Sequence, residues 1–234
     1  MKKEKTTLYR VGRKDTFHEF MIKNAQFEGK WELPIIPNNI YRLPSKLTAY
    51  DQRKNKNKAD YNSFLHFFID DYKFDGPNGI WNGSKKDFYQ KRGFSIEEIK
   101  NYDGIIGPDF TMGFDFPLST QLDQCRRRRY FEYWMYSLGL QVIPFARWTD
   151  ERSYEFAFLG LQNRGIVAIS TFGSMKSNNL KYYFKQGLVE LMKQKDPSII
   201  VVYGTMPEDI FDIIDTNKTK LINFQSDIAS FWSK

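Results

Sequence analysis

The chain is poor in the side chains that most metal and redox sites use. Its 234 residues include one cysteine and two histidines. Because Cys125 is the single cysteine, the chain cannot form an internal disulfide. The absence of disulfides is typical of proteins in a reducing compartment. No apolar stretch approaches the roughly 20 residues that cross a bilayer, and no apolar signal core follows the first residues. We therefore expect a cytoplasmic protein with no membrane partner.

Several catalytic motifs are also missing. Neither His18 nor His66 belongs to a zinc-binding pattern. The chain has no Walker phosphate loop, no G-x-G-x-x-G after a strand and no G-x-S-x-G elbow, which argues against ATPase, dinucleotide-dependent and serine hydrolase chemistry. Tyr182 and Lys185 have the spacing of a rolling-circle nickase tyrosine. Because the paired histidines of that site are missing, packing is the better interpretation.

Positive charge is concentrated near the start of the chain. The formal net charge is +7, and residues 1–60 carry 14 Lys and Arg against 7 Asp and Glu. The excess is densest from Arg53 to Lys58. This segment predicts contacts of Lys54 and Lys56 with a nucleic-acid backbone, or else a solvated linker. We divide the chain into an irregular basic N-terminal extension, residues 1–60, and an α/β core domain, residues 61–234.

Apolar, strand-like runs alternate with helical stretches over most of the chain. The runs are Leu65–Ile69, Gly104–Ile106, Val142–Phe145, Ile166–Ile169, Ile199–Val202 and Leu221–Phe224, with one short strand expected earlier at Ile35–Ile36. The predicted helices include Leu118–Leu138, Glu151–Leu161 and Asn179–Lys193. Strands spaced by helices predict an α/β fold with a mostly parallel sheet of βα units. The pattern fits an open doubly wound sheet or an incomplete TIM-like barrel.

The predicted strands end at polar residues that can bind or react. Ligands of α/β folds bind at the carboxyl ends of the strands, so we expect these endings to converge on one site. Asp71 and Asp109 follow two successive strands and are candidate ligands of Mg²⁺ or Mn²⁺ for phosphodiester chemistry. The alternative is helix capping, for which aspartate is common at such positions.

Four consecutive arginines occupy the longest predicted helix. Residues 126–129 sweep about 300° of the helical wheel, so at least one side chain must face the packed side. Arg129 continues an apolar stripe that includes Cys125, itself predicted to be a small core residue. An unpaired buried charge is very unfavourable. The buried guanidinium therefore either pairs with a strand-end carboxylate or lines a cleft that binds a phosphate or carboxylate.

The segments after two later strands suit a nucleotide. Arg147 and Trp148 offer a cation and a stacking ring to a base or sugar, although Trp148 is equally suited to covering the top of the sheet. The segment Ser170–Ser174 ends a strand and precedes a helix, and its amides and hydroxyls suit an anion. Thr171 and Gly173 are its candidate phosphate-binding residues.

An ordered series of longer strings extends from Pro34 to Phe224. It comprises FLHFFIDDYKF, DGIIGPDFTMGFDFP, RRRRYFEYW, LQVIPFARWTDERSYEFAFLGL, VAISTFGS and IIVVYG. The series resembles a bacterial and phage family known as domain of unknown function 4417. The positions that match recurrent family positions are Asp71, Asp109, Arg127, Arg129, Trp148, Ser153, Thr171, Gly173, Tyr203 and Gly204. The resemblance implies service to phages, plasmids and other mobile elements, and hence DNA transactions in the host bacterial cytoplasm.

Three functional hypotheses follow. The first is a mobile-element protein that binds or cleaves single-stranded or duplex DNA in replication. Its candidate residues are Asp71 and Asp109 for metal binding and catalysis, Arg127, Arg129 and Arg147 for catalysis, and Trp148, Thr171, Gly173, Tyr203, Lys54 and Lys56 for nucleic-acid or phosphate binding. The second is a non-catalytic protein that blocks or recruits a host protein through the basic segment and the loop holding Trp81. The third is an enzyme acting on a small phosphorylated metabolite. The oligomeric state stays open.

Overall fold

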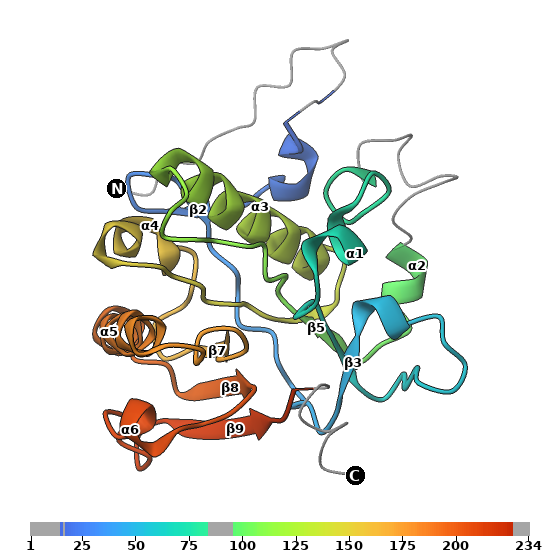
Figure 1. The fold of residues 1–234 in the computed structure, drawn as a ribbon. Helices are drawn as coiled ribbons and strands as arrows, with labels where there is room; N and C mark the ends of the chain where they lie inside the picture. Colours follow the sequence, from blue (N-terminus) through green and yellow to red (C-terminus); the bar gives the residue numbers. More distant parts are fainter. Residues whose placement is uncertain (1–14, 16, 84–95, 227–234) are drawn as a thin grey trace.

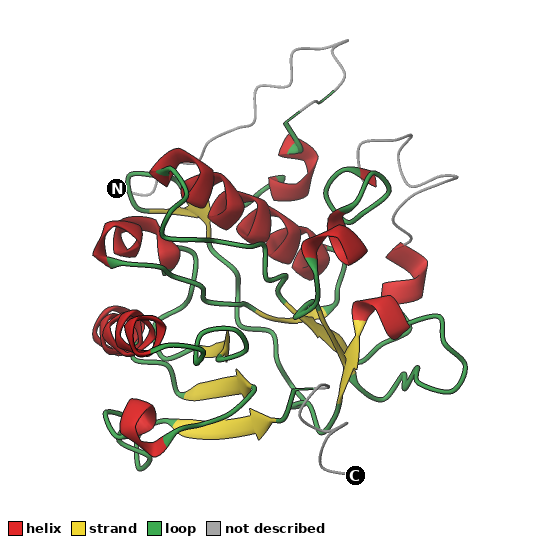
Figure 2. Cartoon of the chain, viewed as in Figure 1, coloured by secondary structure: helices red, strands yellow, loops and turns green. Residues whose placement is uncertain are grey.

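The computed structural model describes residues 15, 17–83 and 96–226 as a mixed α/β protein (Figures 1 and 2). Its strands are β1 (Phe27–Glu28), β2 (Leu33–Pro34), β3 (Leu47–Ala49), β4 (Phe64–His66), β5 (Gly104–Ile106), β6 (Gln141–Ile143), β7 (Ile166–Ser170), β8 (Ile199–Tyr203) and β9 (Lys220–Phe224). Its α-helices are α1 (Asp71–Asp75), α2 (Ile96–Ile99), α3 (Leu118–Ser137), α4 (Tyr154–Ala157), α5 (Asn178–Lys195) and α6 (Glu208–Phe211). Short 3₁₀ turns are η1 (Glu19–Ile22), η2 (Tyr50–Gln52) and η4 (Glu151–Ser153).

Seven of these strands form two parallel sheets. The four-stranded sheet has the order β3-β4-β5-β6, and the three-stranded sheet has the order β7-β8-β9. Every pairing within these two sheets is parallel. The mostly parallel α/β class predicted from the sequence is therefore confirmed. Strands β1 and β2 form a separate antiparallel pair.

A backbone bridge connects the two parallel sheets. Phe145, just beyond β6, pairs in parallel with Ala168 of β7. The amide of Ala146 donates to the carbonyl oxygen of Ala168, and the amide of Ala168 donates to that of Pro144, both at 2.9 Å. The last strand of one sheet therefore lies beside the first strand of the other, and the carboxyl ends of β6 and β7 come together.

Side chains of the two sheets alternate between a shared face and separate outer faces. One apolar cluster contains residues of both sheets, among them Ile106, Phe145, Ala168 and Val201. The described members of this cluster come from strands or the loops next to them. Neighbouring residues point the other way because successive side chains of a strand alternate. Those of β4 to β6 pack with α3, and those of β7 to β9 pack with α5 and α6.

Helix α3 closely matches the predicted Leu118–Leu138 helix, while two other elements differ. The predicted strand at Ile35–Ile36 is found two residues earlier as β2, which pairs with β1 outside the two parallel sheets. The predicted helix Glu151–Leu161 is only a 3₁₀ turn followed by α4. Helix α4 ends at Ala157, and it cannot extend to Leu161 because Gly160 adopts a φ of 83°, outside the helical range.

The described part of residues 1–60 packs against the rest of the chain. Strand β3 pairs with β4, so residues on both sides of the predicted boundary at residue 60 share one sheet. Met21 and Ile22 are buried in the cluster under α3. Glu28 accepts hydrogen bonds from the Nζ of Lys195, near the end of α5. These contacts join described residues between 17 and 60 to both the four-stranded sheet and α5.

None of the helices in the described part of the chain has the length and apolar character needed to cross a membrane.

Candidate functional site

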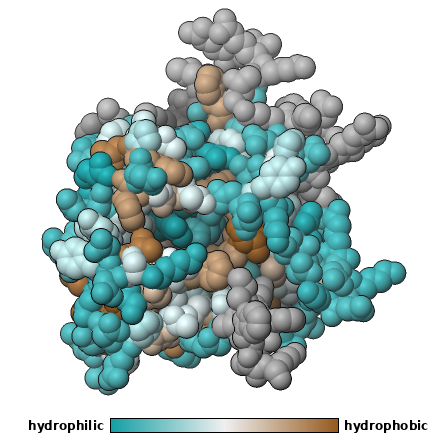
Figure 3. All heavy atoms as spheres, in the orientation of Figure 1, coloured by the Kyte–Doolittle hydropathy of each residue, from teal (hydrophilic) through white to brown (hydrophobic). Residues whose placement is uncertain are grey.

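The loops after β5, β6 and β7 surround a cavity together with the start of α5. We call it the Arg147 cavity, and its volume is about 290 Å³. Its walls are formed by Thr111, Met112, Gly113, Phe114, Asp115, Arg147, Trp148, Thr149, Ser174, Leu180, Tyr183 and Phe184. The expectation that strand endings converge is met for these three strands. Figure 3 shows one face of the molecule, largely hydrophilic and hollowed near its centre.

Arg147 and Asp109 form an ion pair beside this cavity. The Nη1 of Arg147 donates to the Oδ2 of Asp109 at 3.1 Å, and both side chains are mostly buried. The Oδ1 of Asp109 is buried with no hydrogen-bond partner among the described residues. Burial raises the pKa of Asp109, while the charges of Arg147 and Arg128 act to lower it. Arg147 therefore lines the cavity, and the carboxylate of Asp109 lies buried behind it with one oxygen that accepts no hydrogen bond from the described residues.

Asp71 lies at the first turn of α1 and is held by Thr111. Its two carboxylate oxygens accept hydrogen bonds from the amide and the hydroxyl of Thr111, at 3.0 and 2.9 Å. Capping is performed instead by Asp70, whose carboxylate accepts from the amide of Tyr72. The negative charge of Asp71 raises the pKa of Asp109, which places the two acids in the same electrostatic environment. Across residues 15, 17–83 and 96–226, no group of three or more potential metal-binding side chains occurs.

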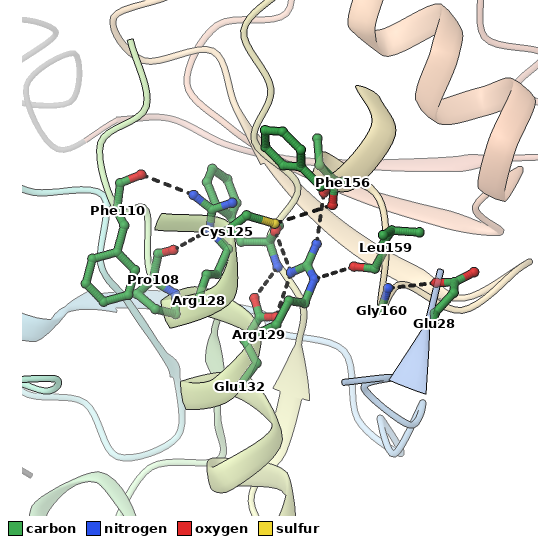
Figure 4. Close-up of polar contacts among 12 residues, drawn as sticks. Glu28, Pro108, Phe110, Cys125, Arg128, Arg129, Glu132, Phe156, Leu159 and Gly160 are labelled. Carbon is green, nitrogen blue, oxygen red and sulfur yellow. Dashed lines mark hydrogen bonds and ion pairs between the residues drawn. The ribbon is translucent and has the colours of Figure 1, made fainter. Parts of the chain in front are cut away.

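Arg127 and Arg129 of α3 are engaged with internal partners rather than with the cavity. Arg127 forms an ion pair with Asp75, and its guanidinium lies 4.4 Å from the ring centroid of Phe110. Arg129 is fully buried and pairs with Glu132 at 2.6 Å. Its remaining hydrogen bonds go to the carbonyl oxygens of Phe145, Ala157 and Leu159 (Figure 4). Arg127 and Arg129 are therefore not placed to neutralise a phosphate in the Arg147 cavity.

The prediction that α3 buries a guanidinium is confirmed, and its partner Glu132 fits neither of the two alternatives, a strand-end carboxylate or a ligand in a cleft. Glu132 lies three residues further along the same helix, a spacing at which helical side chains meet. A second carboxylate oxygen of Glu132 accepts from the amide of Phe145. Two glycines leave room for the pair, because a Cβ at Gly107 would lie 1.8 Å from Glu132 and one at Gly160 would lie 2.9 Å from Arg129.

Arg128 is also fully buried and shapes the loop that carries Asp109. It donates hydrogen bonds to the carbonyl oxygens of Pro108 and Phe110, at 2.9 and 3.1 Å (Figure 4). These two residues flank Asp109 on either side. Burial lowers the pKa of Arg128, but an arginine stays charged at any physiological pH. Arg128 is thus a positioning residue for Asp109, a role that its sequence position alone did not indicate.

Of the predicted ligand-binding residues on later strands, Trp148 lies at the cavity and Thr171 and Tyr203 lie in the interior. Trp148 contacts Gly187 of α5 and the ring of Phe184. The hydroxyl of Thr171 donates to the carbonyl oxygen of Thr205 at 2.7 Å. Tyr203 is buried, with its ring stacked at 4.5 Å on Phe68. Trp148 thus packs against α5 and also lines the cavity, while the stacking of a base or sugar on its ring stays a prediction.

Gly173 occupies the turn after β7 with a φ of 80°, and a Cβ there would meet nothing within 4 Å. Ser174 next to it lines the Arg147 cavity. Gly173 therefore lies at an open surface beside the cavity, in a backbone conformation that favours glycine.

The basic N-terminal segment and the Trp81 loop are not part of the cavity. Lys54 forms an ion pair with Glu98 at 2.7 Å, and Lys56 is exposed nearby. The carbonyl of Arg53 accepts from the hydroxyl of Tyr102, just before β5 begins, so this segment lies toward the amino ends of the strands. Trp81 is buried and stacks on His18 at 3.8 Å. The ring of Trp81 is thus part of the interior, and the host-protein contact expected of its loop stays a prediction.

Sequence reasoning missed most of the cavity wall. Phe114 and Tyr183 were not candidates, although their rings lie 5.6 Å apart at the cavity. Tyr183 follows Tyr182, for which packing was the preferred interpretation, and both lie on α5. Phe114 carried a usable signal, because it is an aromatic residue in a loop that follows a predicted strand, whereas Tyr183 lies within α5 and carried none.

The fold and the cavity define an α/β protein with parallel strands and a ligand-sized cavity at the carboxyl ends of β5, β6 and β7. Residues 25–225 match the family described as Domain of unknown function (DUF4417), and the chain belongs to this family. No solved structure matches the chain.

Two phage proteins are similar to this chain. The Gene 1 protein of Mycobacterium phage D29 is 27% identical over 177 residues, which cover 75% of this chain and 61% of that protein. The Gene 1 protein of Mycobacterium phage L5 is 28% identical over 165 residues, which cover 70% of this chain and 67% of that protein. The chain thus spans roughly two thirds of the length of these relatives. The phage association implied by the sequence resemblance is confirmed.

Proposed function

We propose that this protein binds DNA in the service of a phage or related mobile element, and that it does so at the Arg147 cavity. The observation that carries the proposal is the meeting of a guanidinium with several aromatic rings in one cavity. Arg147 shares the cavity with Phe114, Trp148, Tyr183 and Phe184. A guanidinium recognises phosphate, and aromatic rings stack on bases.

The size and position of the cavity support this proposal. At about 290 Å³ it is close to the lower limit of typical small-molecule sites, which suits a group the size of one nucleotide. We infer that the two sheets form one incomplete barrel whose mouth is this cavity. Ligands of barrels and other α/β folds bind at that end of the strands. The formal net charge of +7 favours an anionic partner.

Arg147 is placed to contact a phosphate from the cavity wall. Among the described residues its guanidinium is bonded only to Asp109, through Nη1. Its other nitrogens are left to donate to a ligand. A charge-assisted hydrogen bond of this kind contributes about 1.5–3 kcal/mol. Loss of the guanidinium should therefore weaken DNA binding by about tenfold or more.

The test is fluorescence anisotropy with a labelled oligonucleotide at fixed salt concentration, comparing Arg147→Ala with Arg164→Ala. Arg164 is a matched control because it pairs with Asp196 at the amino end of β7, away from the cavity. We expect Arg147→Ala to lose about tenfold in affinity and Arg164→Ala less than about threefold. Equal losses for the two variants, or no DNA binding by the unmodified protein, would contradict the proposal.

Metal-dependent phosphodiester cleavage is the enzymatic form of the proposal. Asp71 and Asp109 would hold Mg²⁺ or Mn²⁺, which commonly bind through one or two carboxylates together with substrate phosphates and water. The unused Oδ1 of Asp109 fits this role, whereas both oxygens of Asp71 already accept from Thr111. The ion would polarise the phosphodiester when bound. Arg147 would orient the phosphate, and Arg128 holds the Asp109 loop in place.

Cleavage is tested with supercoiled and single-stranded DNA in the presence of Mg²⁺ or Mn²⁺. We expect nicking by the unmodified protein and its loss in Asp109→Asn, while DNA binding by that variant persists. Absence of any nicking that depends on Asp71 or Asp109 would refute the enzymatic form and leave the binding proposal standing.

A further inference from the structure

The aromatic rings at the Arg147 cavity continue from its interior onto the surrounding surface. Inside, Trp148 lies 5.1 Å from Phe184 between ring centroids. At the wall, Phe114 lies 5.6 Å from Tyr183. Tyr183 in turn lies 5.5 Å from Tyr182, whose residue is 60% exposed. The rings therefore form a series that leads from solvent to the cavity wall.

A second exposed ring lies in the turn that leads to the cavity wall. Phe172 is 43% exposed in the turn after β7, two residues before Ser174 of the cavity wall. Phe114 is itself 44% exposed. Large apolar side chains are seldom left in water as a group, and several around one cavity mark an interaction site. These rings are attached to three different loops or helices, so no single element explains their exposure.

We propose that the nucleic acid bound at the Arg147 cavity is single-stranded DNA, with one unpaired base inside the cavity and its neighbours stacked on Phe172 and Tyr182. The inference rests on the proposed DNA-binding function and adds that the bound DNA is single-stranded rather than duplex. Within a duplex each base face is covered by the next base pair, so a ring-lined cavity receives a base only when it is unpaired.

The charged residues around the cavity are suited to bind single-stranded DNA. Arg147 is available to one phosphate, and Lys176 lies exposed between Ser174 and the start of α5. Asp115 in the wall offers an acceptor to the amino group of a base, a contact that a paired base cannot make with the same edge. Cations that meet the backbone and rings that meet the bases are the combination found in single-strand-binding grooves.

The experiment compares the affinity of the full chain for one oligonucleotide, single-stranded or annealed to its complement, at fixed salt concentration. We expect the single strand to bind at least about tenfold more tightly than the duplex. Tyr182→Ala and Phe172→Ala should each weaken single-strand binding by about fivefold or more, because each removes one stacking ring. Tyr182→Phe keeps the ring and should bind as the unmodified protein does.

Val189→Ala is the control, since Val189 is 42% exposed on the same helix as Tyr182 and does not line the cavity. Circular dichroism confirms that these surface variants fold. Duplex binding equal to or tighter than single-strand binding, or ring variants that bind like Val189→Ala, would overturn the inference. If DNA binding depends on Arg147 but the duplex binds more tightly than the single strand, the single-strand inference is overturned and the proposed DNA-binding function is sustained. If Arg147→Ala binds DNA as tightly as the unmodified protein, both the inference and the proposed function are overturned.

Discussion

The guanidinium of Arg147 lies 3.1 Å from the carboxylate of Asp109. Asp109 follows β5 and Arg147 follows β6, and these strands are neighbours in the four-stranded sheet. Parallel neighbours bring their carboxyl ends to the same edge, so side chains 38 residues apart in sequence become partners. The pair sets the charge at the edge of the Arg147 cavity, because Asp109 partly neutralises the cation that would meet a phosphate.

The first prediction concerns this neutralisation. Asp109→Asn keeps a carbonyl oxygen that accepts the hydrogen bond of Arg147 but removes the negative charge. We expect DNA affinity to rise by about threefold or more at low ionic strength, and the gain to shrink as salt screens the charge. Anisotropy titrations over a range of salt concentrations measure this effect. A loss of affinity instead would show that the carboxylate itself contacts the ligand.

The second prediction concerns the close contact of Trp148 with α5. A Cβ at Gly187 would lie 2.0 Å from the Cδ1 of Trp148, so the indole packs where any other residue has a side chain. Gly→Ala substitutions in helices normally stabilise by about 1 kcal/mol. Here we expect Gly187→Ala to destabilise by about 1–3 kcal/mol through overpacking, and to weaken DNA binding by pushing Trp148 into the cavity.

Urea denaturation measures the stability of Gly187→Ala, with Val189→Ala on the exposed face of the same helix as the control. The control should change the free energy of unfolding by no more than about 0.5 kcal/mol. A Gly187→Ala variant with a higher free energy of unfolding than the unmodified protein would contradict this prediction. It would show that α5 and the indole of Trp148 can move apart without loss of stability.

The third prediction concerns the buried pair of Arg129 and Glu132. Removing one member leaves an uncompensated charge in the interior, so Arg129→Met or Glu132→Leu should each destabilise by about 3–5 kcal/mol. The double substitution Arg129→Met with Glu132→Leu should destabilise by clearly less than the sum of the single changes. Chemical denaturation of the four proteins measures the coupling.

Arg126→Met is the control for this cycle, because its pair with Asp123 is on the surface of α3. An exposed pair contributes at most about 1 kcal/mol. Additive effects at Arg129 and Glu132 would mean that their backbone hydrogen bonds, rather than the ion pair, dominate the stability of this region.

The fourth prediction concerns the pH dependence of stability at His66. Burial lowers the pKa of His66 from 6.5 to about 3, and its Nδ1 accepts a hydrogen bond from the amide of Phe68. Between these pH values the unfolded chain binds a proton that the folded chain does not. The stability due to neutral His66 is therefore fully present above pH 6.5 and is lost progressively as the pH falls toward 3.

His66→Asn keeps an acceptor for the Phe68 amide and does not titrate. Between pH 7.5 and 5.5 the unmodified protein should lose about 1 kcal/mol more stability than this variant. Urea midpoints at the two pH values measure the difference. Parallel pH profiles for the two proteins would mean that folded His66 accepts a proton as easily as the unfolded residue.

The sheet was largely predictable, and the site was predictable only in part. Runs such as Ile166–Ile169 and Ile199–Val202 are apolar on both faces, as parallel strands are, and helical stretches separate them. Arg147 and Trp148 were expected at a strand end and do line the cavity. Arg129 was expected at the same site. The sequence predicted that a guanidinium is buried on this helix, but it did not identify the partner of that guanidinium. The partners, Glu132 and three carbonyl oxygens, depend on loops that only folding brings close.

The sequence by itself determined the parallel α/β class, the position of α3 and the burial of a guanidinium on it, since these follow from local periodicity and from hydrophobicity. Tertiary structure decided which charges face one another. It enclosed Arg127 and Arg129, left Arg147 at a cavity beside Asp109, and directed the Lys54 segment toward the opposite ends of the strands. The physical reason is that contacts between loops depend on how strands are ordered in the sheets, and no local pattern in the chain encodes that order.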